Sequence, residues 1–160
     1  MRKVVLLGVL FALLIVVQAG TAEATYYNPS EEEYVTLVFD DVVQEDLDVD
    51  PFVYNGRTVV PVRFVTEALG ADVAWNQKFD GTVIISTEGE ADPEMSGYPG
   101  GIDVFFDGEM MNQAKWGSPV IVTNRVLVPV RVIAEEVGAE VDWDADERKV
   151  RIWSRERPEL

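Results

Sequence analysis

The sequence predicts an α+β protein of two repeated modules, each a small antiparallel β-sheet with one short helix packed on it. Three observations lead to this prediction. The second half of the chain repeats a pattern of the first half. In each half, short runs of β-branched and aromatic residues stand before and after one helical stripe of apolar residues. Tight-turn residues separate these runs. Strands on both sides of a single helix favour an antiparallel sheet with the helix on one face.

The repeat is visible when residues 57–75 are placed over residues 125–143 without a gap. The shared positions include Arg57/Arg125, Pro61/Pro129, Arg63/Arg131, Glu67/Glu135, Gly70/Gly138 and Trp75/Trp143. Self-similarity of this length indicates an internal duplication. Between the copies, residues 88–101 are rich in Gly, Pro and acidic residues, which predicts a linker.

The first copy begins with predicted strands over 34–39 and 52–54. Asn55-Gly56 predicts a tight hairpin turn, because both residue types tolerate positive φ, and residues 57–60 return as a third strand.

A helix is predicted from Pro61, which suits a first helical turn, to Leu69. Gly70 follows as a left-handed cap. Residues 72–75 and 82–87 are expected to form a closing hairpin.

The chain divides into six predicted segments. They are a signal peptide over 1–24, an N-terminal extension over 25–33, a first module over 34–87, the linker over 88–101, a second module over 102–154 and a tail over 155–160. The signal peptide is predicted from a basic start, an apolar run over 4–17 and the small-x-small pattern Ala22-Glu23-Ala24. We expect cleavage after Ala24, a secreted or extracytoplasmic location and no stable membrane anchor afterwards. The alternative is a retained anchor, but the apolar run is short for a bilayer.

Charge and missing residue types exclude several functions. The chain has 29 acidic and 13 basic residues and a net charge of −16, so we expect no nucleic-acid partner. It contains no His and no Cys, which excludes Ser-His-Asp triads, thiol nucleophiles and the usual zinc and copper ligands.

The triplet Asp46, Asp48 and Asp50 resembles the start of a calcium loop, but the later Gly and Glu of that loop are missing. Paired carboxylates would need a substrate cleft to act on a glycoside. We therefore predict a protein that is not an enzyme and has no cofactor or metal.

The repeated charged residues are interpreted as structural. Arg63 and Glu67 stand four residues apart on the predicted helix, and Arg131 and Glu135 repeat the spacing. The order Arg before Glu is the weaker one for helix stability, so a tertiary ion pair is expected. A binding or catalytic pair is the alternative.

The aromatic residues divide into two groups. Trp75 and Trp143 occupy equivalent positions and are expected in the core, although stacking on a sugar ring is the alternative. Tyr98 and Trp116 have no counterpart in the other copy and are possible ligand contacts. Phe64 lies off the apolar stripe of its helix, so we expect the second module to cover it and the two modules to fold as one unit.

The run from Asn55 to Trp75 resembles the signature of the copper amine oxidase N-terminal domain family, also called stalk domains. Residues 124–143 resemble it again, with Asn124 in place of Gly56. The resemblance implies two tandem copies of a small antiparallel sheet with a helix, in an exported bacterial protein. It does not extend to the oxidase domain that carries copper and a quinone, whose histidine ligands this chain lacks.

The expected function is therefore a secreted, non-catalytic structural or interaction module of the bacterial cell envelope or exterior, with an unknown protein or cell-wall partner. The alternative is a carbohydrate-binding module for cell-wall or environmental polysaccharide.

Overall fold

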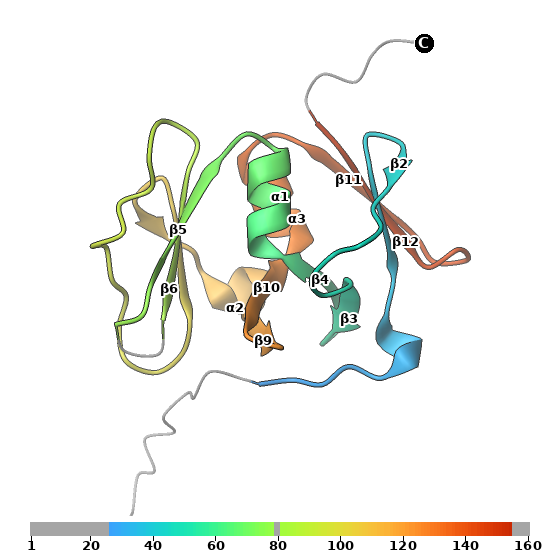
Figure 1. Cartoon of the computed structure of the whole chain (residues 1–160), viewed down its shortest axis with the longest axis horizontal. Coiled ribbons are helices and arrows are strands. Elements are labelled where there is room, and N and C mark those ends of the chain that lie inside the picture. Colours follow the sequence, from blue (N-terminus) through green and yellow to red (C-terminus); the bar gives the residue numbers. More distant parts are fainter. Residues whose placement is uncertain (1–25, 79–80, 155–160) are drawn as a thin grey trace, which may run out of the picture.

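The structure is a computed structural model that describes residues 26–78 and 81–154. The predicted signal peptide and the predicted tail lie outside the described residues. The described part contains twelve strands in three four-stranded sheets, three α-helices and one 3-10 turn (Figure 1). The fold is thus mainly β with a few short helices, in agreement with the α+β class.

The elements have the following bounds. The strands are β1 (Thr36–Phe39), β2 (Val42–Val43), β3 (Phe52–Tyr54), β4 (Arg57–Pro61), β5 (Asp72–Asn76), β6 (Thr82–Ser86), β7 (Asp103–Phe106), β8 (Glu109–Met110), β9 (Val120–Val122), β10 (Arg125–Pro129), β11 (Glu140–Asp144) and β12 (Lys149–Trp153). The helices are η1 (Glu31–Glu33), α1 (Val62–Ala68), α2 (Gln113–Trp116) and α3 (Val130–Glu136). The strands and the helix predicted for the first copy are confirmed to within two residues at each end, while α2 was not predicted.

Each of the three sheets combines strands from both halves of the chain. The two lateral sheets have the orders β11-β12-β1-β2 and β5-β6-β7-β8, and the central sheet has the order β3-β4-β10-β9. Strand β1 pairs with β12 in parallel, and β6 pairs with β7 in parallel. The prediction of one antiparallel sheet within each module is therefore wrong. An isolated two-stranded hairpin is at best marginally stable, and these hairpins find their neighbours in the other half.

The strand pairings repeat when the two halves are exchanged. The β1–β12 pair corresponds to the β6–β7 pair, because each joins the first strand of one repeat to the last strand of the other. In the central sheet Val60 lies opposite Val128, its own counterpart in the repeat.

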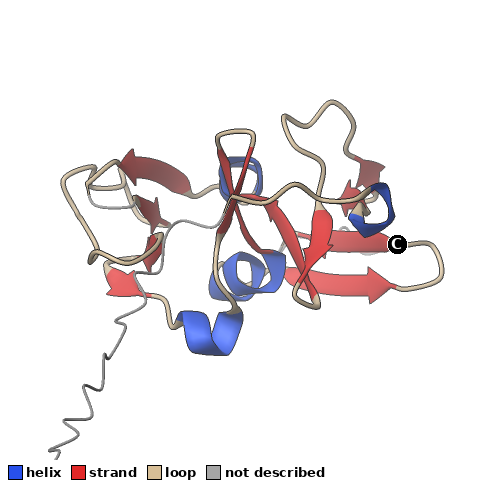
Figure 2. Ribbon diagram, turned by 90° about the horizontal axis from the view of Figure 1, so that it is seen from below, coloured by secondary structure: helices blue, strands red, loops and turns tan. Residues whose placement is uncertain are grey.

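The main core belongs to both halves. Leu37, Val65 and Ile85 from the first half share one buried cluster with Ile133 and Ile152 from the second. Helices α1 and α3 contact each other, with one lateral sheet on either side and the central sheet beneath them (Figures 1 and 2). Neither half has a complete core of its own in this arrangement.

The central sheet is covered on both faces. Val59 and Val60 are both fully buried, but they belong to different clusters, since successive side chains of a strand point to opposite faces. The second cluster is centred on Phe52, and Tyr27 stacks on it with ring centroids 5.5 Å apart. Residues 26–33 of the predicted N-terminal extension thus cover apolar surface of the central sheet.

Each main helix ends as predicted. Gly70 has φ +80°, its N–H donates to the carbonyl of Glu67 at 3.0 Å, and the N–H of Ala71 donates to the carbonyl of Thr66 at 2.9 Å. The same pair of bonds follows Gly138, whose φ is +74°. These two hydrogen bonds together form the Schellman motif, which favours glycine at its left-handed position.

Residues 88–101 do not form a free linker in the structure. The Asn76 side-chain amide donates to the carbonyl of Pro93 at 2.9 Å, and the N–H of Ala91 donates to the Asp72 carboxylate at 2.8 Å. The N–H of Gly97 donates to the Thr82 hydroxyl at 2.9 Å. The segment is the crossover that joins the parallel neighbours β6 and β7, a connection that requires about a dozen residues.

Candidate functional site: two related grooves

Two grooves lie where the halves of the chain meet. The first groove, of about 650 Å³, is lined by Arg63 of α1, Trp75 of β5 and Arg125 of β10. The second groove, of about 420 Å³, is lined by Arg131 of α3, Trp143 of β11 and Arg57 of β4. Each residue of one set is the repeat counterpart of a residue of the other. Each groove therefore takes a helix and a strand from one half and a hairpin from the other.

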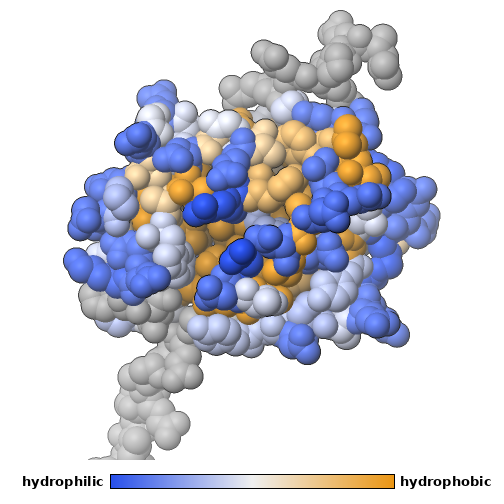
Figure 3. Space-filling model, in the orientation of Figure 1, coloured by the Kyte–Doolittle hydropathy of each residue, from blue (hydrophilic) through white to orange (hydrophobic). Residues whose placement is uncertain are grey.

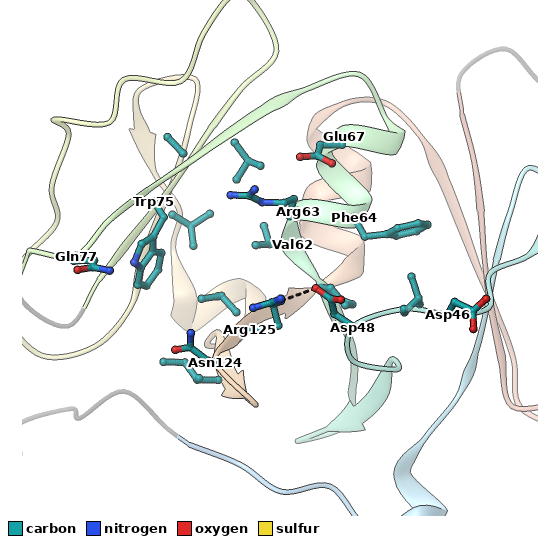
Figure 4. Close-up of a pocket in the computed structure, with 17 residues that line it drawn as sticks. Asp46, Asp48, Val62, Arg63, Phe64, Glu67, Trp75, Gln77, Asn124 and Arg125 are labelled. Atoms are coloured by element: carbon teal, nitrogen blue, oxygen red, sulfur yellow. Dashed lines mark hydrogen bonds and ion pairs between the residues drawn. The ribbon is translucent and has the colours of Figure 1, made fainter.

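The first groove lies beside α1 on the face shown in Figures 1 and 3. Apolar surface gathers around the centre of this face and is crossed by hydrophilic side chains (Figure 3). In the close-up, Arg63 points from α1 towards Trp75, while Phe64 points the opposite way, towards Asp46 (Figure 4). The groove thus continues past both sides of the helix.

The first groove contains a charge pair between the halves. The Arg125 Nε donates to Asp48 Oδ2 at 2.7 Å, drawn as a dashed line in Figure 4. The two side chains are 50% and 66% exposed, so the pair adds little stability. Asp46, Asp48 and Glu67 all line this groove together with two arginines. Its lining is therefore close to balanced in charge.

The second groove lacks that balance. Arg57, Lys115 and Arg131 line it, and the lining includes no Asp or Glu from the described part of the chain. Arg57 donates to the backbone carbonyl of Lys115 at 3.5 Å, and the Lys115 ammonium lies 3.9 Å from the centroid of the Trp116 ring. Helix α2, which carries Lys115, stands where the first half has the loop with Asp46 and Asp48. The grooves therefore share a plan and differ in charge.

Trp75 and Trp143 are not buried in the core, contrary to the prediction. Each is 37% exposed, and each lines one groove. Both stand on β5 or β11, edge strands of the lateral sheets, where one face of the strand is open. The Trp75 ring packs against Gly81 so closely that no side chain would fit there. The equivalent positions of the two tryptophans in the repeat thus reflect equivalent grooves.

Two further groups of predicted site residues are the Pro and Gly residues at the helix ends and the aromatic residues Tyr98 and Trp116. Pro61 and Pro129 precede α1 and α3, where Gly70 and Gly138 cap the opposite ends. Tyr98 is 70% exposed and lines neither groove, whereas Trp116 is half-buried and lines the second one.

The ion pairs predicted on the two helices contribute little to stability. Arg131 and Glu135 are 3.8 Å apart, and their side chains are 59% and 46% exposed. Arg63 and Glu67 form no ion pair within the described residues. The arginines of both helices instead line the grooves. The expectation that these pairs orient the helices therefore fails for the first copy and is weak for the second.

Two carboxylates near the β11–β12 turn have a lowered pKa. Hydrogen bonds from the Glu147 N–H and the Arg151 side chain lower the pKa of Asp144, and the neighbouring Lys149 lowers the pKa of Glu147. A general acid needs the opposite shift, towards neutral pH. No group of three or more His, Cys, Asp or Glu that could hold a metal ion occurs among residues 26–78 and 81–154.

Lys115 was not singled out from the sequence, and Asp48 was considered only as part of a calcium loop and not as a groove residue. Neither has a counterpart of the same charge in the other copy, so the comparison of the repeats passes over both. The only sequence signal for Lys115 is its place beside Trp116, an aromatic residue that the repeat does not explain.

Comparison with known proteins supplies the family. The copper amine oxidase N-terminal domain family matches residues 38–152 in a single stretch. The match is to the non-catalytic N-terminal domain and not to the oxidase domain. No curated protein and no solved structure matched the chain.

Two further observations accompany this match. Among the described residues, no helix has the length and apolar character needed to cross a membrane. The matched stretch covers most of the chain. It includes both grooves and all twelve strands, except the first two residues of β1 and the last residue of β12. The chain belongs to the copper amine oxidase N-terminal domain family.

Proposed function

We propose that the protein is a secreted, non-catalytic interaction module of the bacterial cell envelope or exterior, and that its two grooves are the surfaces through which it binds. The observation that carries this proposal is the pairing of the grooves. Each places a half-exposed Trp beside arginines from both halves of the chain. A role limited to spacing other domains apart would not require such a groove, still less two built on the same plan.

A carbohydrate ligand is the second candidate, and the tryptophans favour it. A Trp that is 37% exposed at the rim of a groove offers an apolar ring face next to polar groups. Sugar rings present the same combination of an apolar face and polar edges. Binding sites of this kind combine aromatic surface with a few placed polar groups.

The experiment is affinity electrophoresis of residues 25–160 through gels that contain cell-wall or environmental polysaccharides, with Trp75→Ala, Trp143→Ala and the double variant. Loss of one stacking platform should weaken binding by roughly tenfold. Tyr98→Ala is the control, because Tyr98 is exposed but lies in neither groove. Equal retardation of all variants would refute a carbohydrate site in the grooves.

The wider interaction role has its own test. The protein, immobilised by its C-terminus, is exposed to envelope extracts of a bacterial host, and the wild type is compared with the double Trp variant. A partner retained by the wild type and lost from the variant supports the proposal. A partner that both retain would place binding outside the grooves.

The proposal also includes export of the protein and an internal duplication of its sequence. Expression in a bacterial host followed by N-terminal sequencing should give a product that begins at Thr25; a cell-retained product that still begins at Met1 would refute export. We further infer that the family match over 38–152 spans two tandem copies, because the shared residues and the exchanged strand pairings follow one pattern.

A further inference from the structure

The second groove is lined by positive charge, whereas the chain as a whole is strongly acidic. The sequence holds 29 acidic and 13 basic residues, yet three basic side chains and no carboxylate of the described residues line this groove. The first groove, built on the same plan, has three carboxylates and two arginines. The difference comes from the segments that complete each groove, because Lys115 of α2 enters where Asp46 and Asp48 stand in the other half.

The three basic side chains of the second groove differ in the contacts that they already make with the described part of the protein. Among residues 26–78 and 81–154, Arg57 makes one long hydrogen bond of 3.5 Å, to the backbone carbonyl of Lys115, so most of its donors have no partner there. Lys115 contacts the Trp116 ring and leaves its three donors for another group. Arg131 has one exposed carboxylate neighbour, Glu135, at 3.8 Å. An anion entering the groove would meet hydrogen-bond donors that the described part of the chain does not satisfy.

The backbone at Gly117 leaves room for the Arg57 side chain. Its side chain crosses Gly117, where an added Cβ would lie 2.9 Å from Arg57 Cδ and 3.3 Å from Pro129 Cγ. Gly117 also has φ +97°, a conformation that residues with a side chain rarely adopt. The glycine therefore lets an arginine of one half lie flat against the other half, at the wall of the groove.

We propose that the second groove binds an acidic polysaccharide, with the carboxylate of a uronic acid residue held by Arg57, Lys115 and Arg131 and its sugar ring against Trp143. This proposal deepens the carbohydrate function proposed above and rests on it. Arginine pairs with carboxylates through two parallel hydrogen bonds, which gives selectivity as well as affinity. The Debye length in physiological salt is about 8 Å, so the acidic surface elsewhere is largely screened from a ligand in the groove.

The test is calorimetric titration of residues 25–160 with tetragalacturonate and with its full methyl ester. The two probes share their sugar rings and differ only in charge. The wild type should bind the free acid at least roughly tenfold more tightly than the ester, since hydrogen bonds to charged groups are about twice as strong as neutral ones. Arg57→Gln, Lys115→Gln and Gly117→Ala should each weaken binding of the free acid, and Trp143→Ala should weaken binding of both probes.

Exposed residues outside both grooves provide the controls. Lys78→Gln removes one positive charge and Tyr98→Ala removes one aromatic ring, and both should leave binding of the free acid unchanged. Circular dichroism confirms that each variant is folded. Equal affinity for acid and ester, both lost in Trp143→Ala, would overturn the acidic ligand and leave the carbohydrate function standing. Failure of the wild type to bind either probe, or full binding by Arg57→Gln, would overturn the inference itself.

Discussion

At the scale of single residues, the groove side chains depend on partners that are far away in the sequence. Arg57 bonds to a carbonyl 58 residues later, and Arg125 pairs with a carboxylate 77 residues earlier. These two arginines are counterparts in the repeat, and each belongs to a hairpin that completes a groove of the opposite half. The repeated residues thus describe contacts between the halves as much as the structure of either one.

The helix caps give the first prediction. Gly70→Ala should lower the free energy of unfolding by about 1 kcal/mol, because alanine is strained at φ +80° while the space around the position is open. Urea denaturation measures the change. Gly70→Asn is the control and should cost less, since asparagine tolerates the left-handed conformation. An alanine variant as stable as the wild type would contradict the cap.

The exposure of the tryptophans gives the second prediction. Phe52→Ala should cost about 3–5 kcal/mol, because Phe52 is fully buried at the centre of the second cluster. Trp143→Ala should cost clearly less, because Trp143 is 37% exposed. Urea denaturation of the two variants ranks them. If Trp143→Ala proves the more damaging, the ring is a core element and not a free surface of the groove.

At the scale of elements, local signals predicted the first copy well. The Asn55-Gly56 turn has the two positive φ angles, 49° and 72°, that a tight hairpin needs, and the strands on either side lie where they were expected. The helix ends at its glycine for an equally local reason. Patterns read over a few residues therefore fix hairpins and caps in this chain.

Pairing between elements could not be read in the same way. An apolar strand such as β12 has the same residue pattern whether its neighbour is β11 alone or β11 and β1 together. The swapped partners also account for the wrong placement of Trp143, since the edge of a sheet is defined only once its strand order is known. The grooves, which need a hairpin from the opposite half, were out of reach for the same reason.

The N-terminal segment gives a prediction about pH. Hydrogen bonds from the Tyr27 hydroxyl and from Ser30 lower the pKa of Glu33, while the bond to Glu33 raises the pKa of Tyr27. A carboxylate with a lowered pKa in the folded state stabilises the protein above its usual pKa of about 4 and loses that contribution as the pH falls below it. Urea melts between pH 6 and pH 3 should therefore show a steeper loss for the wild type than for Glu33→Gln. Parallel pH profiles would mean that the segment does not hold Glu33.

At the scale of the whole molecule, the coupling of the halves is a property of the sheets. Phe64 was expected to hold the halves together, and it does pack against the main cluster. Backbone pairing of β1 with β12, of β4 with β10 and of β6 with β7 joins the halves more extensively than one side chain can. Phe64→Ser should therefore lower stability without separating the halves.

The central claim is that the two repeats form a single folded unit whose grooves exist only when both halves are present. The direct test is chemical unfolding of residues 25–160, of residues 25–90 and 100–160 made separately, and of the two fragments mixed in equal amounts. We predict one cooperative transition for the whole chain, no cooperative transition for either fragment, and recovery of β-sheet circular dichroism on mixing. Two separate fragments that each unfold cooperatively with the midpoint of the intact chain would contradict this claim.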